Sequence, residues 1–145
     1  MNAPISRDPP VSSVAGRAAR LAFWGYAVAL FALTHWPKLQ LPGPHNTDKV
    51  VHVAVFGMWT ALLIAAGFFG RILARRNLAT CLVIAPVYAA IDEALQAIPV
   101  LHRSAEFADY YANLGGIALA GLAAAAVIWL RTRAKADHSA FNAHE

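Results

Sequence analysis

Cysteine and charge are both scarce in this chain. The 145 residues include one cysteine, Cys81, so no disulfide can form within the chain, and neither a CxxC pair nor a zinc-type Cys/His spacing occurs. Charged residues make up 14% of the chain and hydrophobic residues 59%, a balance too apolar for an ordinary soluble domain of this length. The formal net charge is +4, but no basic stripe with interleaved aromatic residues accompanies it, which argues against nucleic acid as a partner.

Sequence signatures of hydrolysis and transport are also missing. There is no HExxH pair and no GxSxG elbow, and Ser104 is interpreted as a loop or N-cap serine before the last apolar segment. No internal repeat is visible, which argues against a transporter built from inverted halves. We therefore expect no cofactor, and an enzyme is not the first interpretation.

The chain has instead four long apolar segments, at 18–36, 50–70, 78–98 and 110–130. Each has about 19–21 residues and would be about 28–32 Å long as a helix, which matches the hydrocarbon thickness of a bilayer. Backbone that crosses lipid is satisfied only in helices or closed barrels, and the period-2 alternation of barrel strands is absent. The sequence predicts an all-α fold, an integral membrane four-helix bundle occupying residues 17–131.

The ends of the chain are predicted to be cytoplasmic tails. Residues 1–16 are rich in Pro, Ser and Ala without a hydrophobic period, which predicts a disordered tail, and residues 132–145 form the second tail. The segment 18–36 ends in Thr34-His35-Trp36-Pro37 and not in a small-residue cleavage site, so we interpret it as a helix that stays in the membrane and not as a signal peptide.

Lysine and arginine are distributed unevenly between the two sides of the predicted membrane region. The side with the excess is expected to face the cytoplasm, which places both termini inside. That side carries Arg7, Arg17, Arg20, Arg71, Arg75, Arg76, Arg131, Arg133 and Lys135, and the outer side carries Lys38, Lys49 and Arg103.

Ionisable and amide side chains within or beside the predicted helices are expected to gather at the outer end. The pairs Asp48 with His52, Asp92 with Gln96, and Asp109 with Asn113 are each four residues apart, so each pair shares a helix face. Charges on these faces would be costly in lipid, so the faces should turn toward one another and form a cluster that opens outward. The candidate residues are His35, Asp48, Lys49, His52, Asp92, Glu93, Gln96, Arg103, Asp109 and Asn113.

Asp92 and Glu93 are neighbours, and neighbouring helical residues point about 100° apart. They are therefore not expected to form a paired acid/base dyad, and each needs its own partner. Two interpretations of the polar cluster stay open. It is a ligand-binding site, as intramembrane charges commonly are, or a buried network that holds the helices together.

A divalent metal is a further alternative for the polar residues. His52 with Asp48, Asp92 or Asp109 offers nitrogen and oxygen ligands that suit such an ion. Their spacing matches no established metal motif, so no metal is assigned.

Three residues are expected to shape helix packing. Pro86 lies in the middle of 78–98 and removes a backbone hydrogen bond, which should bend that helix. Gly116 and Gly121 are each followed by alanine four residues later, a small-residue face for close helix contact. That face could pack within the chain or form a homo-oligomer.

The order of these motifs resembles the VanZ-like family. The resemblance covers 35–120 and rests on Thr34-His35-Trp36-Pro37, Asp48-Lys49-x-x-His52, Asp92-Glu93-x-x-Gln96, Arg103, and Asp109-x-x-x-Asn113-x-x-Gly116. The family pattern commonly has Pro-Gly before the loop arginine, where this chain has Leu101-His102. The resemblance implies a multi-pass protein of the bacterial inner membrane and a role in the cell envelope. The founding member is associated with resistance to the glycopeptide antibiotic teicoplanin.

Three functions are compatible with these residues. The first is binding of an amphiphilic molecule, a lipid-linked envelope intermediate or a lipid-bearing glycopeptide, among membrane lipids. The second is an enzyme acting on an envelope lipid, with Asp92 or Glu93 as general base and His52 as proton shuttle or ligand. The third is a structural or assembly protein. The outer side carries Lys38, Lys49 and Arg103 against Asp48, Asp92, Glu93, Glu106 and Asp109, a formal charge of −2 that favours a cationic or mixed-charge ligand over a simple phosphate.

Overall fold

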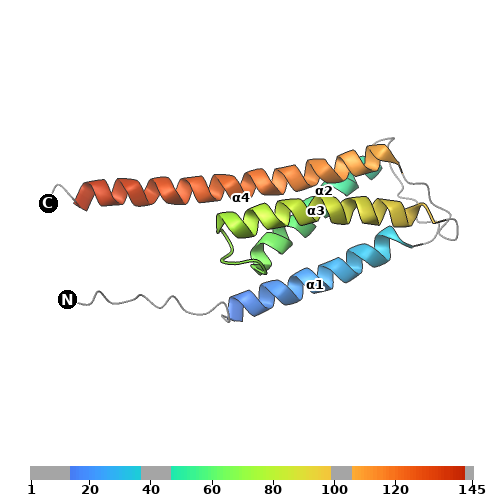
Figure 1. Ribbon diagram of the computed structural model, residues 1–145, viewed down its shortest axis with the longest axis horizontal. Coiled ribbons are helices and arrows are strands. Elements are labelled where there is room, and N and C mark those ends of the chain that lie inside the picture. The colour runs from blue at the N-terminus through green and yellow to red at the C-terminus, as the bar shows by residue number, and fades with distance from the viewer. Residues whose placement is uncertain (1–13, 37–46, 99–105, 143–145) are drawn as a thin grey trace.

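The computed structural model describes residues 14–36, 47–98 and 106–142, and all regular structure in these ranges is α-helical. The helices are α1 (Val14–Thr34), α2 (Thr47–Ala66), α3 (Arg75–Gln96) and α4 (Phe107–Asn142). They lie roughly along one axis, and successive helices run in opposite directions, so that α1 begins and α4 ends at the same end of the molecule (Figure 1). The predicted all-α class is confirmed.

The helix ends differ from the predicted ones for local reasons. Each helix begins three or four residues before the predicted apolar segment, because hydropathy does not register a polar first turn. α2 ends at Ala66 because Gly67 follows it with φ 59°, a left-handed conformation that glycine adopts without strain. α4 continues to Asn142, through most of the predicted tail at 132–145, since no proline or glycine after Gly121 interrupts it. Of the predicted tail at 1–16, the described part belongs to α1.

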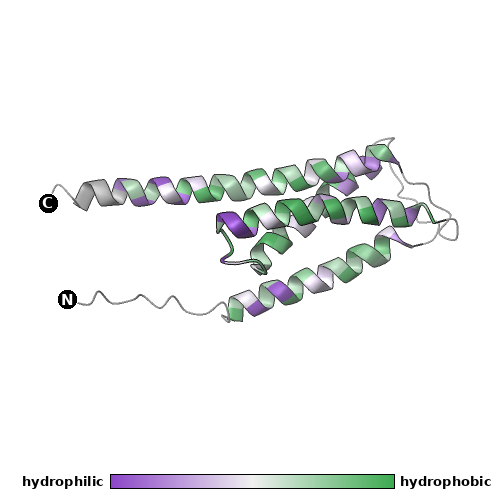
Figure 2. Cartoon of the chain, in the orientation of Figure 1, coloured by the Kyte–Doolittle hydropathy of each residue, from purple (hydrophilic) through white to green (hydrophobic). Residues whose placement is uncertain are grey.

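Three of the helices, α2, α3 and α4 as far as Asp137, are long and apolar enough to cross a membrane. α1 is not among them, and it carries Arg17 and Arg20 in its first two turns. Most residues of the helices are hydrophobic (green in Figure 2), and many large apolar side chains are exposed, with Val50 at 66% and Val83 at 68% exposure. A surface of this kind is stable against hydrocarbon and not against water, which indicates a membrane protein.

α2 is the central element, since the two most extensive helix contacts are those that it makes with α4 and with α1. Trp59 on α2 packs its ring against Phe23 of α1 at 5.4 Å and stacks on Tyr88 of α3 at 4.5 Å between ring centroids. The Tyr26 hydroxyl of α1 donates a hydrogen bond of 3.0 Å to the Val55 carbonyl of α2. Aromatic packing therefore joins α1 and α3 to α2.

The contact between α2 and α4 is closest at two glycines. A Cβ atom built on Gly116 would collide with the Val53 carbonyl oxygen and would lie 2.8 Å from the Gly57 nitrogen, both in the backbone of α2. A Cβ on Gly121 would lie 2.9 Å from the Leu82 side chain of α3. Of the two packing modes left open for this face, the structure places both glycines in contacts within the chain.

α3 contains a proline in its interior and a buried asparagine near its start. Pro86 lies inside α3, which continues through it without interruption. Asn77 is fully buried near the start of α3, where its Nδ2 donates to the carbonyls of Ile64 and Ile72 and its Oδ1 accepts from the Phe69 N–H. Asn77 thus closes the turn between α2 and α3. The amide side chains were all expected at the end of the molecule where α2 and α4 begin. This expectation was wrong for Asn77, because the predicted helix began one residue after it.

We expect Gly116→Ala to destabilise the fold by about 1–3 kcal/mol, because the added methyl forces the α2 and α4 backbones apart. The matched control is Gly25→Ala, since a Cβ at Gly25 meets nothing within 4 Å. Equilibrium unfolding in mild detergent would compare the two variants. Equal stability of both variants would contradict the close contact.

Candidate functional site

Polar side chains of all four helices meet where α1 and α3 end and α2 and α4 begin. We call this region the polar end. Most of its members are buried, with Asp92 at 1%, Gln96 at 2% and His52 at 5% exposure, although all lie beside long apolar helices. The polar end consists of Thr34, His35, Asp48, Lys49, His52, Asp92, Glu93, Gln96, Glu106, Asp109 and Asn113.

Asp92 links α1 to α3. Its Oδ1 accepts a hydrogen bond of 3.0 Å from the Thr34 hydroxyl, and its Oδ2 accepts one of 3.0 Å from the Gln96 amide, one turn along α3. His35 Nδ1 lies 3.8 Å from Oδ1. Because both carboxylate oxygens are already bonded within the chain, the geometry favours a structural role for Asp92 over that of a general base. Sequence reasoning missed Thr34, whose only signal is a hydroxyl beside His35 at the end of an apolar run.

Lys49 links α2 to α4. Its ammonium lies 2.5 Å from Asp109 Oδ1 and 3.2 Å from Glu106 Oε2, and 3.7 Å from Asp48 Oδ2 in the preceding position. The side chain of Asp109 is 10% exposed, whereas those of Lys49, Asp48 and Glu106 are 33%, 43% and 53% exposed. This group therefore has one buried carboxylate and an accessible rim of both charge signs.

His52 forms a second link between α2 and α4. Its Nδ1 lies 2.9 Å from Asn113 Oδ1, so an N–H at Nδ1 would leave Nε2 without a proton. Nε2 lies 3.7 Å from Asp48 Oδ1 and 4.0 Å from Asp109 Oδ2.

One potential ligand atom from each of Asp48, His52 and Asp109 lies within 4.8 Å of the others, a set that could hold a divalent ion. Asp92, the other carboxylate considered for a metal, bonds to Thr34 and Gln96 instead. The ammonium of Lys49 already provides positive charge beside Asp48 and Asp109.

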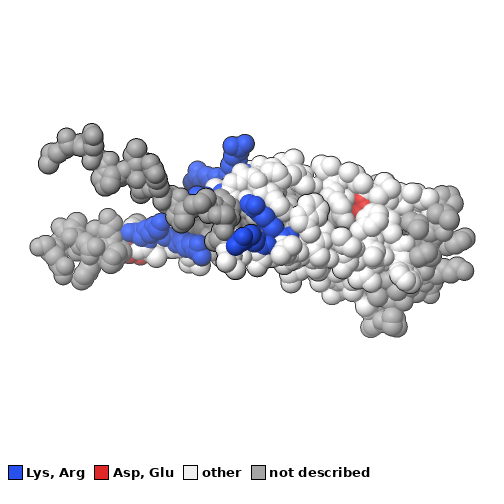
Figure 3. Space-filling model, turned by 90° about the horizontal axis from the view of Figure 1, so that it is seen from below, with Lys and Arg blue, Asp and Glu red and all other residues white. Residues whose placement is uncertain are grey.

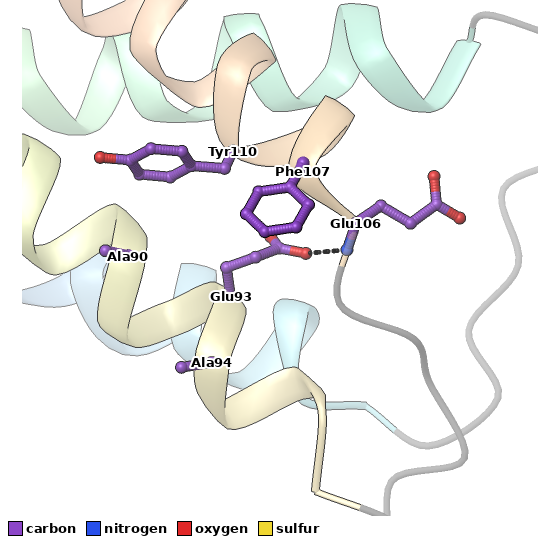
Figure 4. A pocket seen from close by; sticks show the side chains of 6 residues that line it. All are labelled: Ala90, Glu93, Ala94, Glu106, Phe107 and Tyr110. Carbon is purple, nitrogen blue, oxygen red and sulfur yellow. Dashed lines mark hydrogen bonds between the residues drawn. The ribbon is translucent and has the colours of Figure 1, made fainter.

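Glu93 links α3 to α4 on a different side from Asp92, as the angle between neighbouring helical residues predicted. Its Oε1 accepts the Glu106 N–H at 2.8 Å and so caps the start of α4. Its Oε2 is buried and has no hydrogen-bond partner among the residues that the structure describes. Beside Glu93 lies a cavity of about 400 Å³, walled by Ala90, Ala94, Glu106, Phe107 and Tyr110 (Figure 4).

The structure thus brings together nine of the ten predicted site residues. The tenth, Arg103, lies outside the described residues. Glu106 was counted in the outer charge but was not proposed as a site residue. Its backbone N–H donates to Glu93, and its carboxylate pairs with Lys49. Neither role is visible in the sequence.

We expect Lys49→Met to lower the free energy of unfolding by about 1–3 kcal/mol, because the buried Asp109 carboxylate would lose its ammonium partner. Asp109→Asn in the same chain should restore part of that loss. Lys135→Met, at an exposed position near the far end of α4, serves as the control. Additive effects of Lys49→Met and Asp109→Asn in thermal unfolding would contradict a direct pair.

Comparison of the chain with protein-family models, with curated proteins and with solved structures finds no match. A statement about function therefore depends on the chemistry of the polar end and on the resemblance between motifs.

Proposed function

We propose that this chain is a VanZ-like membrane protein of the bacterial cell envelope that binds the polar head of an amphiphilic envelope molecule at its polar end. The observation that carries the proposal is the accessible rim of both charge signs formed by Asp48, Lys49 and Glu106. This rim lies at one end of helices with apolar outer surfaces. A molecule with a charged head and a hydrocarbon tail complements both features.

The proposed arrangement is a four-helix bundle in the inner membrane with both termini in the cytoplasm. The positive-inside rule supports it, since nine lysines and arginines flank one side and three the other. In the view of Figure 3, Lys and Arg side chains gather on the half of the molecule nearer the two ends of the chain. In this arrangement α1 is the fourth spanning helix, with Arg17 and Arg20 reaching the inner interface. The polar end then faces outward.

The VanZ-like resemblance supports the same site and supplies the class of ligand. Apart from Arg103, the hydroxyl, amide and ionisable residues that carry the resemblance all belong to the polar end. An amphiphilic envelope intermediate or a lipid-bearing glycopeptide is the ligand that this resemblance favours. The excess of acidic over basic groups on the outer side further favours a head that carries positive charge.

A second candidate is a structural or assembly protein. It is favoured by the way in which Asp92, Lys49 and Glu93 each bond across two helices. In that case the polar end locks the helices together and binds nothing. The two candidates differ in what happens when an accessible polar group is removed without loss of stability.

We expect native mass spectrometry with metal analysis to find an amphiphile retained by the purified protein, with a mass that identifies its class. Asp48→Asn should reduce the adduct about tenfold, because it removes an accessible charge of the rim. His52→Ala should also reduce it. Asp137→Asn, exposed near the far end of α4, should retain it. Absence of an adduct from every sample, with His52→Ala less stable to heat, would favour the structural candidate.

The proposed topology is tested by thiol labelling of intact cells with a reagent that does not cross membranes. Gln40→Cys, in the segment between α1 and α2, should be labelled in intact cells. Lys135→Cys should be labelled only after the membrane is opened. The wild-type chain should stay unlabelled in both cases, since Cys81 is fully buried. The reverse pattern would invert the protein and place the polar end in the cytoplasm.

A further inference from the structure

The cavity beside Glu93 has the construction of a ligand site. It is an open depression between α3 and α4, with Phe107 85% exposed at its edge, and its volume of about 400 Å³ is within the range of about 300–1,000 Å³ that is common for small-molecule sites. Its walls are mainly the alanine methyls of α3 and the rings of Phe107 and Tyr110. Figure 4 shows the Phe107 ring beside the Glu93 carboxylate and the Tyr110 ring on the side of Ala90. Such walls suit a hydrocarbon chain.

The polar member of the cavity is incompletely bonded. Glu93 is 7% exposed, and its carboxylate has two different surroundings. Oε1 accepts the Glu106 N–H, which fixes the side chain between α3 and α4. Oε2 has no partner among the described residues. A buried carboxylate oxygen without a hydrogen-bond donor is unfavourable, so a donor on a bound molecule would stabilise it.

The charges around the cavity favour a cationic donor. Two carboxylates line the cavity, those of Glu93 and Glu106, and the described ammonium that reaches Glu106 is that of Lys49. Lys49 contacts Asp109 and Glu106 and has no contact with Glu93. A hydrocarbon chain alone would fill the walls and leave Oε2 unpaired.

We propose that this cavity binds a single hydrocarbon chain whose polar end is a protonated primary amine. The N–H of the ammonium donates to Glu93 Oε2, the chain lies along Ala90, Ala94 and Tyr110, and the Phe107 ring flanks the cation. This inference rests on the proposed function, since it names the chemistry of the amphiphile. It assigns Glu93 two roles, a helix cap through Oε1 and a ligand contact through Oε2.

The test measures dissociation constants for the full-length protein in uncharged detergent with three probes of equal chain length. Tetradecylamine has the charge and the N–H donors, tetradecyltrimethylammonium has the charge alone, and tetradecanol has a neutral donor. We expect the amine to bind about tenfold more tightly than either other probe, because a charge-assisted hydrogen bond needs both properties.

Glu93→Gln separates the two roles of this residue. The glutamine oxygen still accepts the Glu106 N–H, so the melting temperature should stay close to that of wild type. The amide replaces Oε2 and removes the negative charge, so the amine should lose its advantage while the affinity for tetradecanol changes little.

A second variant tests the hydrocarbon part without changing Glu93. Ala94→Leu fills the cavity and should weaken binding of all three probes. Ala79→Leu, at an exposed position on the same helix nearer the start of α3, should leave them unchanged.

Equal affinities for the three probes in the wild type, unchanged by Glu93→Gln and Ala94→Leu, would overturn the inference and leave the cavity as a contact for bulk lipid or another helix. Should Glu93→Gln fail to fold, the preference for the amine in the wild type and the weaker binding of all three probes by Ala94→Leu would still decide. Failure of the proposed function has a different signature. No amphiphile would co-purify with the protein, and the amine preference at Glu93 would remain.

Discussion

The structure depends on one constraint, that a polar group inside an apolar medium must find its partner within the protein. Hydrocarbon does not drive apolar helices together as water does, so close backbone packing and hydrogen bonds between helices determine how they associate. The Gly57–Gly116 contact supplies the close packing between α2 and α4. The carboxylates of the polar end supply bonds between helices that are far apart in the sequence.

The polar bonds are divided between the two ends of the helices. At one end Asn77 satisfies three backbone groups of the α2–α3 turn, where a chain reversal leaves carbonyls and an N–H unpaired. At the polar end Asp92 joins α1 to α3, and Lys49 joins α2 to α4. The middle of the bundle is occupied mainly by aromatic rings and glycines, with the hydrogen bond from the Tyr26 hydroxyl to the Val55 carbonyl. The charged groups of the described helices therefore lie toward the helix ends, and the cost of burying charge in the centre of the membrane is avoided.

Sequence patterns predicted the number, order and class of the helices, because length and hydropathy are local properties. The i, i+4 rule placed Asp92 beside Gln96, and these two do bond. The partners across helices were not predictable, since they depend on how each helix is rotated about its axis. Thus the sequence did not specify which carboxylate Lys49 would meet, and packing brought it to Asp109. Hydropathy also could not predict the length of α4, which is determined by helix propensity and the lack of a stop signal.

The length of α4 has a mechanical consequence. Its 36 residues form one uninterrupted helix of about 54 Å, which in Figure 1 extends well past the other three. The close contact at Gly116 lies in the first third of this helix, so it can act as a pivot with a short arm toward Phe107 and a long arm toward Asn142. A small movement of the short arm therefore produces a larger displacement of the long arm, which carries Arg131, Arg133 and Lys135. A movement of α4 at the polar end would thus shift basic charge at the opposite end of the protein.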